Sequence, residues 1–530
     1  MNSGVTPSRA VPPHRPCVDL ERQSEGLDDD AVHRFILGCD DRPNKLSPQE
    51  ATQQLGDRFA QLVLLKGVFP RNAGEVLNAI EQAVPSGHPL RVQQFFLVGE
   101  GTQIAPMPGV AVNRNLRFVA TVGKGPGGPD IMVSAFHPDH GTIELMAWDL
   151  AVGGFNYYRT VGTSSAWVFA GNSRHALTAP TRDNGPFESH KSGHFLMKEL
   201  REPWVNWHSP KARAVPSIFA EENLLDHPWV ANLAPGDAYT LEEDVTIPAI
   251  QRWTKARLEA LVSGNSDETP RRVLEQVLTT LTVNLASSNT SSVAAATGAV
   301  PRVDLPDTFF VDSAALSEVL GLMSPPRPFV PSTLYAESLK TFDVRLTDDS
   351  QFERPGDTHF AFVVPERAFE DTDTLREAIE RGILSRRLAA CLLMVDFPNP
   401  IFSEKRQRLL EHVPDSAFGQ VGDFSQSIAD AIRASAAATQ PGTPENEFAQ
   451  LWDAGEDFKA PFDALLQNYY TAFGERLATQ EGFDGYVRLA EARRDRVKAM
   501  PITESPMLFS RTNIPSVVRT MRADGTVEEA

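Results

Sequence analysis

Apolar residues at helical spacing mark where ordered structure is expected to begin. Ser47-Pro48-Gln49-Glu50 combines an N-cap serine, a proline at the first helical position and a glutamate three residues after the cap, which together form a capping box. The helix that it opens is expected to reach about Lys66, and a second helix is expected over residues 72–84. Residues 1–45 show no sustained periodicity and predict a mostly flexible arm, although residues 32–39 are apolar enough to dock.

The pattern changes after residue 91 to short runs of Val, Ile, Phe, Tyr and Trp separated by Gly, Pro and Asn. These runs recur roughly every dozen residues with no helical pattern between them, which is typical of an antiparallel sheet or a small barrel. The expected strands cover residues 92–98, 116–122, 131–136, 142–149, 154–159 and 166–169.

Helical spacing returns later and dominates the second half of the chain. Helices are expected over residues 240–262, 269–285, 313–320, 373–381, 385–395, 403–412, 425–438, 445–472 and 484–500, with strands at 342–346 and 359–364. The fold class is therefore α+β: an N-terminal, mainly antiparallel β domain with flanking helices, followed by a largely helical C-terminal half.

A tract of small polar residues divides these two parts. Residues 287–303 are rich in Ser, Thr, Ala and Asn, with little side chain to bury, and we interpret them as a linker. An α+β domain of residues 46–286 would precede it, and a mainly helical domain of residues 304–530 would follow.

The amino-acid composition and the net charge limit the kinds of molecule that the protein is expected to bind. The 530 residues are 41% hydrophobic and 22% charged, as is typical of globular proteins, and the net charge of −19 argues against nucleic acid as a general partner. The longest apolar runs fall far short of the roughly 18 residues of a membrane span. Three cysteines cannot form a disulfide framework, and no apolar stretch follows Met1, so a cytoplasmic location is expected.

Histidine and tryptophan cluster in one part of the chain. Five of the 12 histidines fall between residues 175 and 227, and six of the seven tryptophans between 148 and 253. His190 and His194 are four residues apart, so they would share one face of a helix and could bind one metal ion, with His208 or a carboxylate such as Glu188 or Glu199 completing the ligand set. Ser192 and Gly193 weaken such a helix, and hydrogen-bonded loop histidines are the alternative.

A second pattern overlaps this pair. Pro186-Phe187-Glu188-Ser189-His190 resembles the Cys-x-x-Cys-His attachment motif of c-type cytochromes, with both cysteine positions replaced, by Pro186 and Ser189. The resemblance covers five residues, and only His190 matches a functional position. It implies that His190 is an axial haem ligand and that the haem, lacking thioether bonds, is held noncovalently.

Neighbouring side chains fit the same kind of site. Tyr157, Trp204 and Trp207 are expected to pack against a flat cofactor, and Lys198 and Arg201 to meet an anionic group. His175 is assigned as a proton-transfer group, because a free imidazole titrates near neutral pH. The alternatives are an aromatic core for the tryptophans and solvated surface charge for Arg201.

These patterns lead to two functional hypotheses. The first is an oxidoreductase-like protein that binds haem or a divalent or transition metal ion noncovalently through histidine, and acts on a small-molecule substrate. The second is a cofactor-free module that binds a ligand or another protein through an aromatic-lined pocket. A hydrolase ranks behind both, because no nucleophile can be identified in the sequence.

Overall fold

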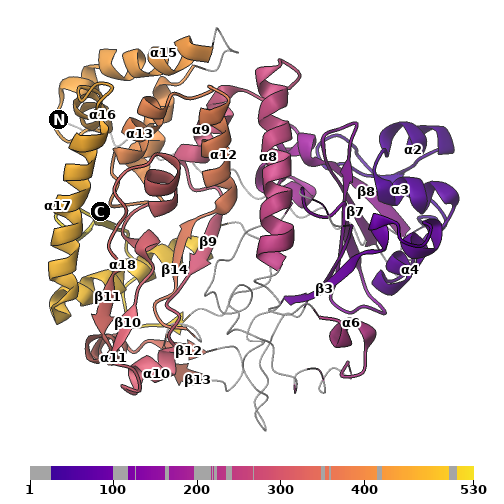
Figure 1. Cartoon of the computed structure of the whole chain (residues 1–530), viewed down its shortest axis with the longest axis horizontal. Helices are drawn as coiled ribbons and strands as arrows, with labels where there is room; N and C mark the ends of the chain where they lie inside the picture. Colours follow the sequence, from indigo (N-terminus) through magenta and orange to yellow (C-terminus); the bar gives the residue numbers. More distant parts are fainter. Residues whose placement is uncertain are drawn as a thin grey trace, which may run out of the picture.

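The chain is an α+β protein, as its sequence predicts, with a large sheet in the N-terminal half and mainly helices in the C-terminal half (Figure 1). The computed structural model describes residues 26–98, 117–123, 125, 127–161, 166–195, 217, 219, 224–233, 241–266, 268–347, 353–356, 360–414, 421–500 and 510–530. Within these ranges, no helix combines the length and the apolar character needed to cross a bilayer.

Six strands of the N-terminal sheet form an antiparallel meander in which each strand pairs with the next. Each predicted strand of this region is present, with its ends within three residues of the expected positions. The strands are β3 (Gln93–Val98), β4 (Arg117–Val122), β5 (Ile131–Ala135), β6 (Ile143–Asp149), β7 (Gly154–Val161) and β8 (Ala166–Asn172).

The sheet is completed by residues that we expected to be part of a flexible arm. β1 (Val32–Arg34) pairs in parallel with β8, and β2 (Asn44–Lys45) pairs antiparallel to β1. Val32 and Ile36 are buried in the core beneath α2 to α4. The apolar run of residues 32–39 does dock, as its composition allowed, but residues 44–45 form a strand as well, so the predicted arm of residues 1–45 extends too far.

Three helices cover one face of the sheet: α2 (Pro48–Gln54), α3 (Arg58–Leu62) and α4 (Ala73–Ala83) (Figure 1). The capping box of Ser47 and Glu50 is present, but the predicted helix to Lys66 is broken between α2 and α3. Asp57 causes the break, because its carboxylate caps α3 and also accepts a hydrogen bond from Asn156 Nδ2 on β7 (2.8 Å). The helix is interrupted at this point, and the Asp57 carboxylate instead joins the segment to the sheet through a buried hydrogen bond.

The opposite face is covered by the π-helical turn η6 (Glu242–Thr246) and by α8 (Ile247–Val262). Trp253 of α8 packs into the core on this face, whereas Leu258 and Leu261 of the same helix belong to the core of the C-terminal half. One helix thus contributes to both cores, and Figure 1 shows it standing between the sheet and the C-terminal helices.

The C-terminal half is built from helices around short strand pairs. Its helices are α9 (Pro270–Leu278), α10 (Ser292–Ala296), α11 (Ser332–Thr341), α12 (Phe369–Glu380), α13 (Arg386–Met394), α14 (Glu404–Arg408), α15 (Val421–Ala434), α16 (Pro444–Trp452), α17 (Lys459–Leu477) and α18 (Gln480–Lys498). Its strands are β9 (Val283–Ala286), β10 (Arg302–Asp304), β11 (Phe329–Pro331), β12 (Arg345–Thr347), β13 (Glu353–Pro355), β14 (Val364–Arg367), β15 (Ser510–Arg511), β16 (Arg519–Met521) and β17 (Val527–Glu529).

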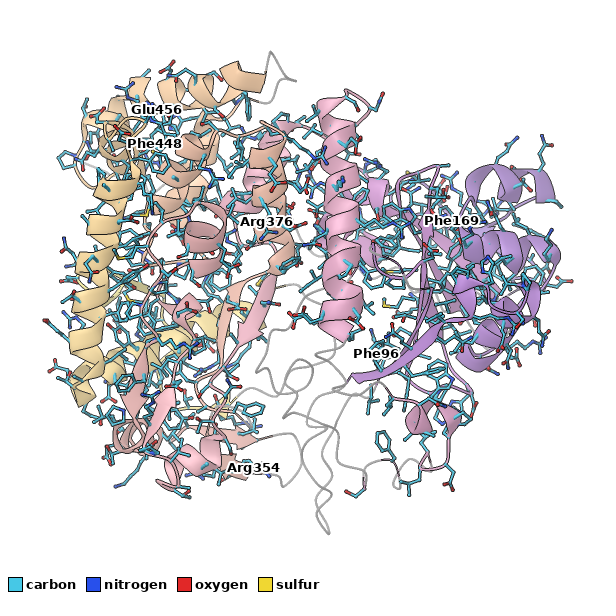
Figure 2. All side chains as sticks on the ribbon, viewed as in Figure 1. Phe96, Phe169, Arg354, Arg376, Phe448 and Glu456 are labelled. Carbon is cyan, nitrogen blue, oxygen red and sulfur yellow. The ribbon has the colours of Figure 1, made fainter. Side chains whose placement is uncertain are left out.

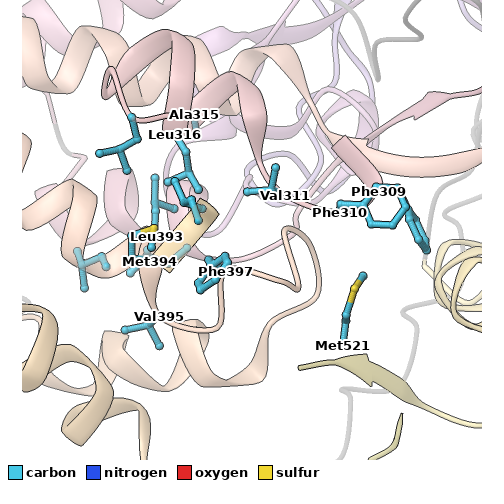
Figure 3. Close-up of a cluster of buried hydrophobic side chains, with 14 of the residues drawn as sticks. Phe309, Phe310, Val311, Ala315, Leu316, Leu393, Met394, Val395, Phe397 and Met521 are labelled. Carbon is cyan, nitrogen blue, oxygen red and sulfur yellow. The ribbon is translucent and has the colours of Figure 1, made fainter. Parts of the chain in front are cut away.

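The core of this half gathers side chains from distant parts of the sequence. Figure 3 shows the rings of Phe309, Phe310 and Phe397 in one cluster that also includes Leu393 and Met521. Because these residues come from separate elements, burying them ties the end of the chain to its middle.

The segment that we interpreted as a linker is packed into the C-terminal half. It contains α10 and the start of β10, and Ser287, Ser288 and Ser292 are buried. Ser288 N donates to Ala361 O, and Ala361 N donates to Thr290 O, both at 2.8 Å. Small side chains allow the backbone of this segment to pair closely with its neighbour. The segment therefore lies in the interior, although its composition resembles that of a linker.

A buried ion pair links α8 to the C-terminal half. Arg257 on α8 and Glu268 both have side chains only 1% exposed, and Arg257 Nε donates to both carboxylate oxygens (3.1 and 2.9 Å). Arg257 Nη1 also donates to Gln276 Oε1 on α9 (2.7 Å), and Gln276 Nε2 donates to Asp371 Oδ1 on α12 (2.9 Å). α12 packs directly against α8, and Figure 2 labels Arg376 on the α12 side of this boundary.

Arg257→Leu is expected to destabilise the protein strongly, because it leaves the Glu268 carboxylate buried without a cation. Breaking a buried pair in this way typically costs about 3–5 kcal/mol. Arg257→Leu combined with Glu268→Leu removes both charges and should recover much of the loss. Denaturant unfolding followed by circular dichroism measures this, and equal stability of the single and double variants would contradict the expectation.

Candidate functional site

The residues selected from the sequence follow β8, where the chain makes three short turns: η3 (Ser173–Ala176), η4 (Gly185–Glu188) and η5 (Lys191–Gly193). The segment between His190 and His194 is not an α-helix, because Ser192 and Gly193 both have positive φ (56° and 74°). A Cβ on Gly193 would collide with the Ser173 carbonyl, so this turn requires glycine. The helical face that His190 and His194 were to share does not exist.

His190 is held by hydrogen bonds around this turn. Its Nδ1 lies 2.9 Å from the carbonyl oxygen of His194, and its ring packs edge-on against Tyr157, with ring centroids 4.9 Å apart. The Tyr157 hydroxyl donates toward the carbonyl oxygens of Gly193 and His194 (2.9 and 3.0 Å). Ser173 Oγ donates to the Gly193 carbonyl (2.8 Å). Tyr157 and His190, which the sequence placed in one site, are therefore brought together.

This hydrogen bond determines the chemistry of the His190 ring. A carbonyl oxygen can only accept, so Nδ1 carries the proton and Nε2 has a free lone pair in the neutral ring. Desolvation lowers the pKa of His190 to about 4, which keeps the ring neutral at pH 7. The residue is partly exposed. A neutral imidazole with Nδ1 donating to a carbonyl has the orientation common among metal-bound histidines.

His194 has a different environment. Its side chain is fully buried, and its Nε2 lies 3.4 Å from Gln276 Nε2, the amide that also binds Asp371. Burial, with a smaller effect of the nearby Arg257 charge, holds the pKa of His194 well below its usual value. Among the described residues no partner is found for its Nδ1. His194 is thus a contact between the two halves, and the helical arrangement by which it was to share a metal ion with His190 is not formed.

His175 is a capping residue. Its Nδ1 accepts a hydrogen bond from the backbone N–H of Asn172 (3.1 Å), and the Asn172 side chain caps η3 in return. Burial lowers the pKa of His175. The contacts of this ring explain how η3 begins, and its contacts with the described residues do not bear on the predicted role in proton transfer, which stays a prediction.

The other predicted site residues cannot be placed. Arg201, Trp204, Trp207 and His208 lie outside the described residues, as do Lys198 and Glu199. In the part of the chain that the structure describes, no group of three or more His, Cys, Asp or Glu side chains is arranged to hold a metal ion.

Four tryptophans of the cluster are described, and all are buried in the two cores of the N-terminal half. Trp253 Nε1 donates to the Ser192 carbonyl (2.8 Å), which supports the η5 turn from α8. Trp167 Nε1 donates to the Pro70 carbonyl (2.9 Å), and Trp148 and Trp229 pack on neighbouring phenylalanines. For these four, the aromatic-core alternative is the correct interpretation.

Sequence reasoning missed a row of polar side chains beside His190. Val119, Met132, Met146 and Tyr157 point toward the side of the sheet on which His190 lies, and we call this side the His190 face. Successive side chains of a strand point to opposite faces of the sheet, and the pairing of the strands places five polar residues on the His190 face as well. They are Arg117, Thr121, Ser134, Glu144 and Arg159. Glu144 and Arg117 are close enough to His190 for their charges to act on its pKa.

The signal for this row is present in the sequence. Glu144 and Arg159 interrupt otherwise apolar strands at positions that alternate toward the face of Met146 and Tyr157. Only the register of the sheet shows that these interruptions lie opposite each other. Compared with known proteins, the chain matches no family model, no curated protein and no solved structure.

The pH dependence of stability tests the state of the His190 ring. Its pKa in the folded chain is about 4, against about 6.5 in an unfolded chain. The stability that the neutral ring contributes is therefore complete above pH 6.5 and is lost as the pH falls toward 4. His190→Asn cannot be protonated, and its amide nitrogen can replace Nδ1 as donor to the His194 carbonyl.

Thermal unfolding midpoints should fall further in wild type than in His190→Asn between pH 6.5 and 4.5. The comparison removes contributions from groups that both proteins share. His140→Asn is the matched control, because it removes an exposed histidine and should follow the wild-type profile. Parallel profiles for wild type and His190→Asn would show that the ring is not held neutral.

Proposed function

We propose that this chain is an oxidoreductase-like protein that binds haem noncovalently, with Nε2 of His190 as the axial ligand to iron. The observation that supports this most directly is the 2.9 Å contact between His190 Nδ1 and the His194 carbonyl, because it directs the lone pair of the neutral ring to Nε2. His190 is half-buried, and none of the hydrogen bonds of the described residues uses its Nε2.

Haem suits these residues better than a bare ion does. A porphyrin would bring its own nitrogen ligands to the iron, so a single histidine of the protein, His190, would be enough to hold it. Val119, Met132 and Met146 on the His190 face are already buried in the core that η6 and α8 cover, so contacts to a flat ring would come from the side chains around His190 itself. When bound, haem supplies the one-electron chemistry, and the protein supplies orientation and electrostatics.

The residues around His190 fit the task of orienting an axial ligand. Tyr157 packs against the ring and binds the same carbonyl that the ring binds. These contacts hold the His190 ring in one orientation even when no ligand is present, so less conformational entropy is lost when a ligand binds. A small-molecule substrate and a cytoplasmic location accompany this proposal, since noncovalent haem requires no cysteine pair.

A second candidate is a cofactor-free module that binds a small ligand on the His190 face. It is favoured by the hydroxyls of Thr121 and Ser134, which are buried and find no hydrogen-bond partner among the described residues. Buried polar groups are normally satisfied, so unsatisfied ones on one face suggest an external partner.

Titration of the purified full-length chain with haemin, followed by ultraviolet–visible spectroscopy before and after reduction, tests the first candidate. Wild type should develop a Soret band that shifts on reduction. His190→Asn should weaken haemin binding by at least about 10- to 100-fold, because loss of even an outer-shell partner of a metal site has effects of this size.

His140→Ala serves as the matched control, because it removes an exposed histidine that could bind haemin adventitiously. It should retain the wild-type spectrum. An unchanged spectrum in His190→Asn would mean that another residue ligates the iron. A wild-type spectrum that haemin does not alter would overturn the haem proposal and favour the second candidate.

A further inference from the structure

The contact between α8 and α12 buries a carboxylate that has no cation of its own. On α8, Arg257 is paired with Glu268. On β14, Arg367 is paired with Asp312, and both side chains are buried. Asp371 lies in the first turn of α12 and is 2% exposed, and no ion pair joins it to a described residue. Each of the two guanidinium groups already has a carboxylate, so Asp371 is the carboxylate left over.

An uncharged amide takes the place of a cation at Asp371. Gln276 Nε2 on α9 donates to Asp371 Oδ1 (2.9 Å). Gln276 Oε1 accepts from Arg257 Nη1 (2.7 Å), and this second bond fixes the orientation of the amide. Hydrogen bonds from neutral donors stabilise a carboxylate less than those from a guanidinium do. A negative charge at Asp371 is therefore poorly compensated inside the protein.

Charged and titratable groups face Asp371 from the elements around it. They are Arg257 on α8, Arg367 on β14, Asp312 ahead of the π-helical turn η8 (Ala314–Val319), His194 behind the Gln276 amide, and Glu370 and Asp373 on α12 itself. Burial holds the pKa of His194 well below its usual value, so this ring adds no positive charge at neutral pH. Burial also raises the pKa of Asp371 to about 7, against the opposing charges of Arg367 and Arg257.

We propose that Asp371 makes the contact between α8 and α12 a pH-sensitive switch: an uncharged Asp371 holds the two halves together, and an ionised Asp371 loosens them. When the contact opens, the side chain reaches water, where an aspartate has a pKa of about 3.9. The stability of the contact is therefore complete below about pH 4, falls as the pH rises toward 7, and then levels off. The switch needs no cofactor, and it reaches the candidate site because Gln276 also contacts His194.

Hydrogen–deuterium exchange of α8 and α12, followed by mass spectrometry of the full-length chain, measures this opening. Asp371→Asn cannot ionise and keeps an oxygen that accepts from Gln276, so it should hold the contact closed at every pH. Dividing the wild-type exchange rate by the Asp371→Asn rate at the same pH cancels the pH dependence of chemical exchange. Asp373 and the other acids titrate in both proteins, so their contributions cancel as well. The ratio should rise roughly 50-fold between pH 5 and pH 7 and change little above pH 8.

Glu380→Gln is the matched control, because it removes an exposed carboxylate from the opposite end of α12. The ratio of wild-type to Glu380→Gln rates should not depend on pH. A wild-type to Asp371→Asn ratio that stays constant, or that falls as the pH rises, would overturn the switch.

Wild type alone provides a second measurement, which decides if circular dichroism shows that Asp371→Asn does not fold. Figure 1 shows α17 on the far side of the C-terminal half from α8, so its exchange serves as an internal reference. Exchange in α8 and α12, divided by exchange in α17 at the same pH, should rise between pH 5 and pH 7. If this ratio does not change with pH, Asp371 does not control the contact.

Discussion

The buried charge of Arg257 is the constraint on which the arrangement of the two halves depends. A guanidinium removed from water must be paired, and this one is paired only if α8, α9 and Glu268 meet. Gln276 then connects the pair to Asp371 on α12 and to the ring of His194. The turn that carries His194 is thus attached to the C-terminal half through a polar contact. The backbone carbonyl of His194 in turn orients His190, so the core of one half positions the candidate ligand of the other.

The turn beside His190 is specified by its carbonyl groups. Tyr157, Ser173 and His190 all direct hydrogen bonds to the carbonyls of residues 193 and 194, and Trp253 binds the carbonyl of residue 192. These side-chain hydrogen bonds satisfy backbone carbonyls that have no partner in a regular helix or strand. It also explains how an imidazole can be fixed through one nitrogen while the other stays available. A helix would have placed His190 and His194 together but would have used these carbonyls internally.

Local patterns predicted the elements whose determinants are local. Short apolar and aromatic runs between turn residues identified the strands from β3 to β8, and the capping box identified the start of α2. Predictions failed where a distant contact decides the structure: the small residues 287–303 pair with residue 361, and Asp57 breaks a helix to reach Asn156. The candidate site shows the same difference between features set by local sequence and features set by distant contacts. His190 was found through residue clustering, whereas the row from Ser134 to Arg159 exists only through the register of three strands.

The parallel pairing of β1 with β8 has a consequence for how the molecule is assembled. Val32 pairs with Trp167, so β1, the first strand of the described residues, completes a sheet whose other strands lie next to their neighbours along the chain. The hairpins from β3 to β8 are local, and closing them costs little loop entropy, whereas β1 must wait for the strand most distant from it. During synthesis β1 and β2 therefore lack their neighbour in the sheet until the meander is complete, and this pair of strands is among the last parts of the sheet to be incorporated.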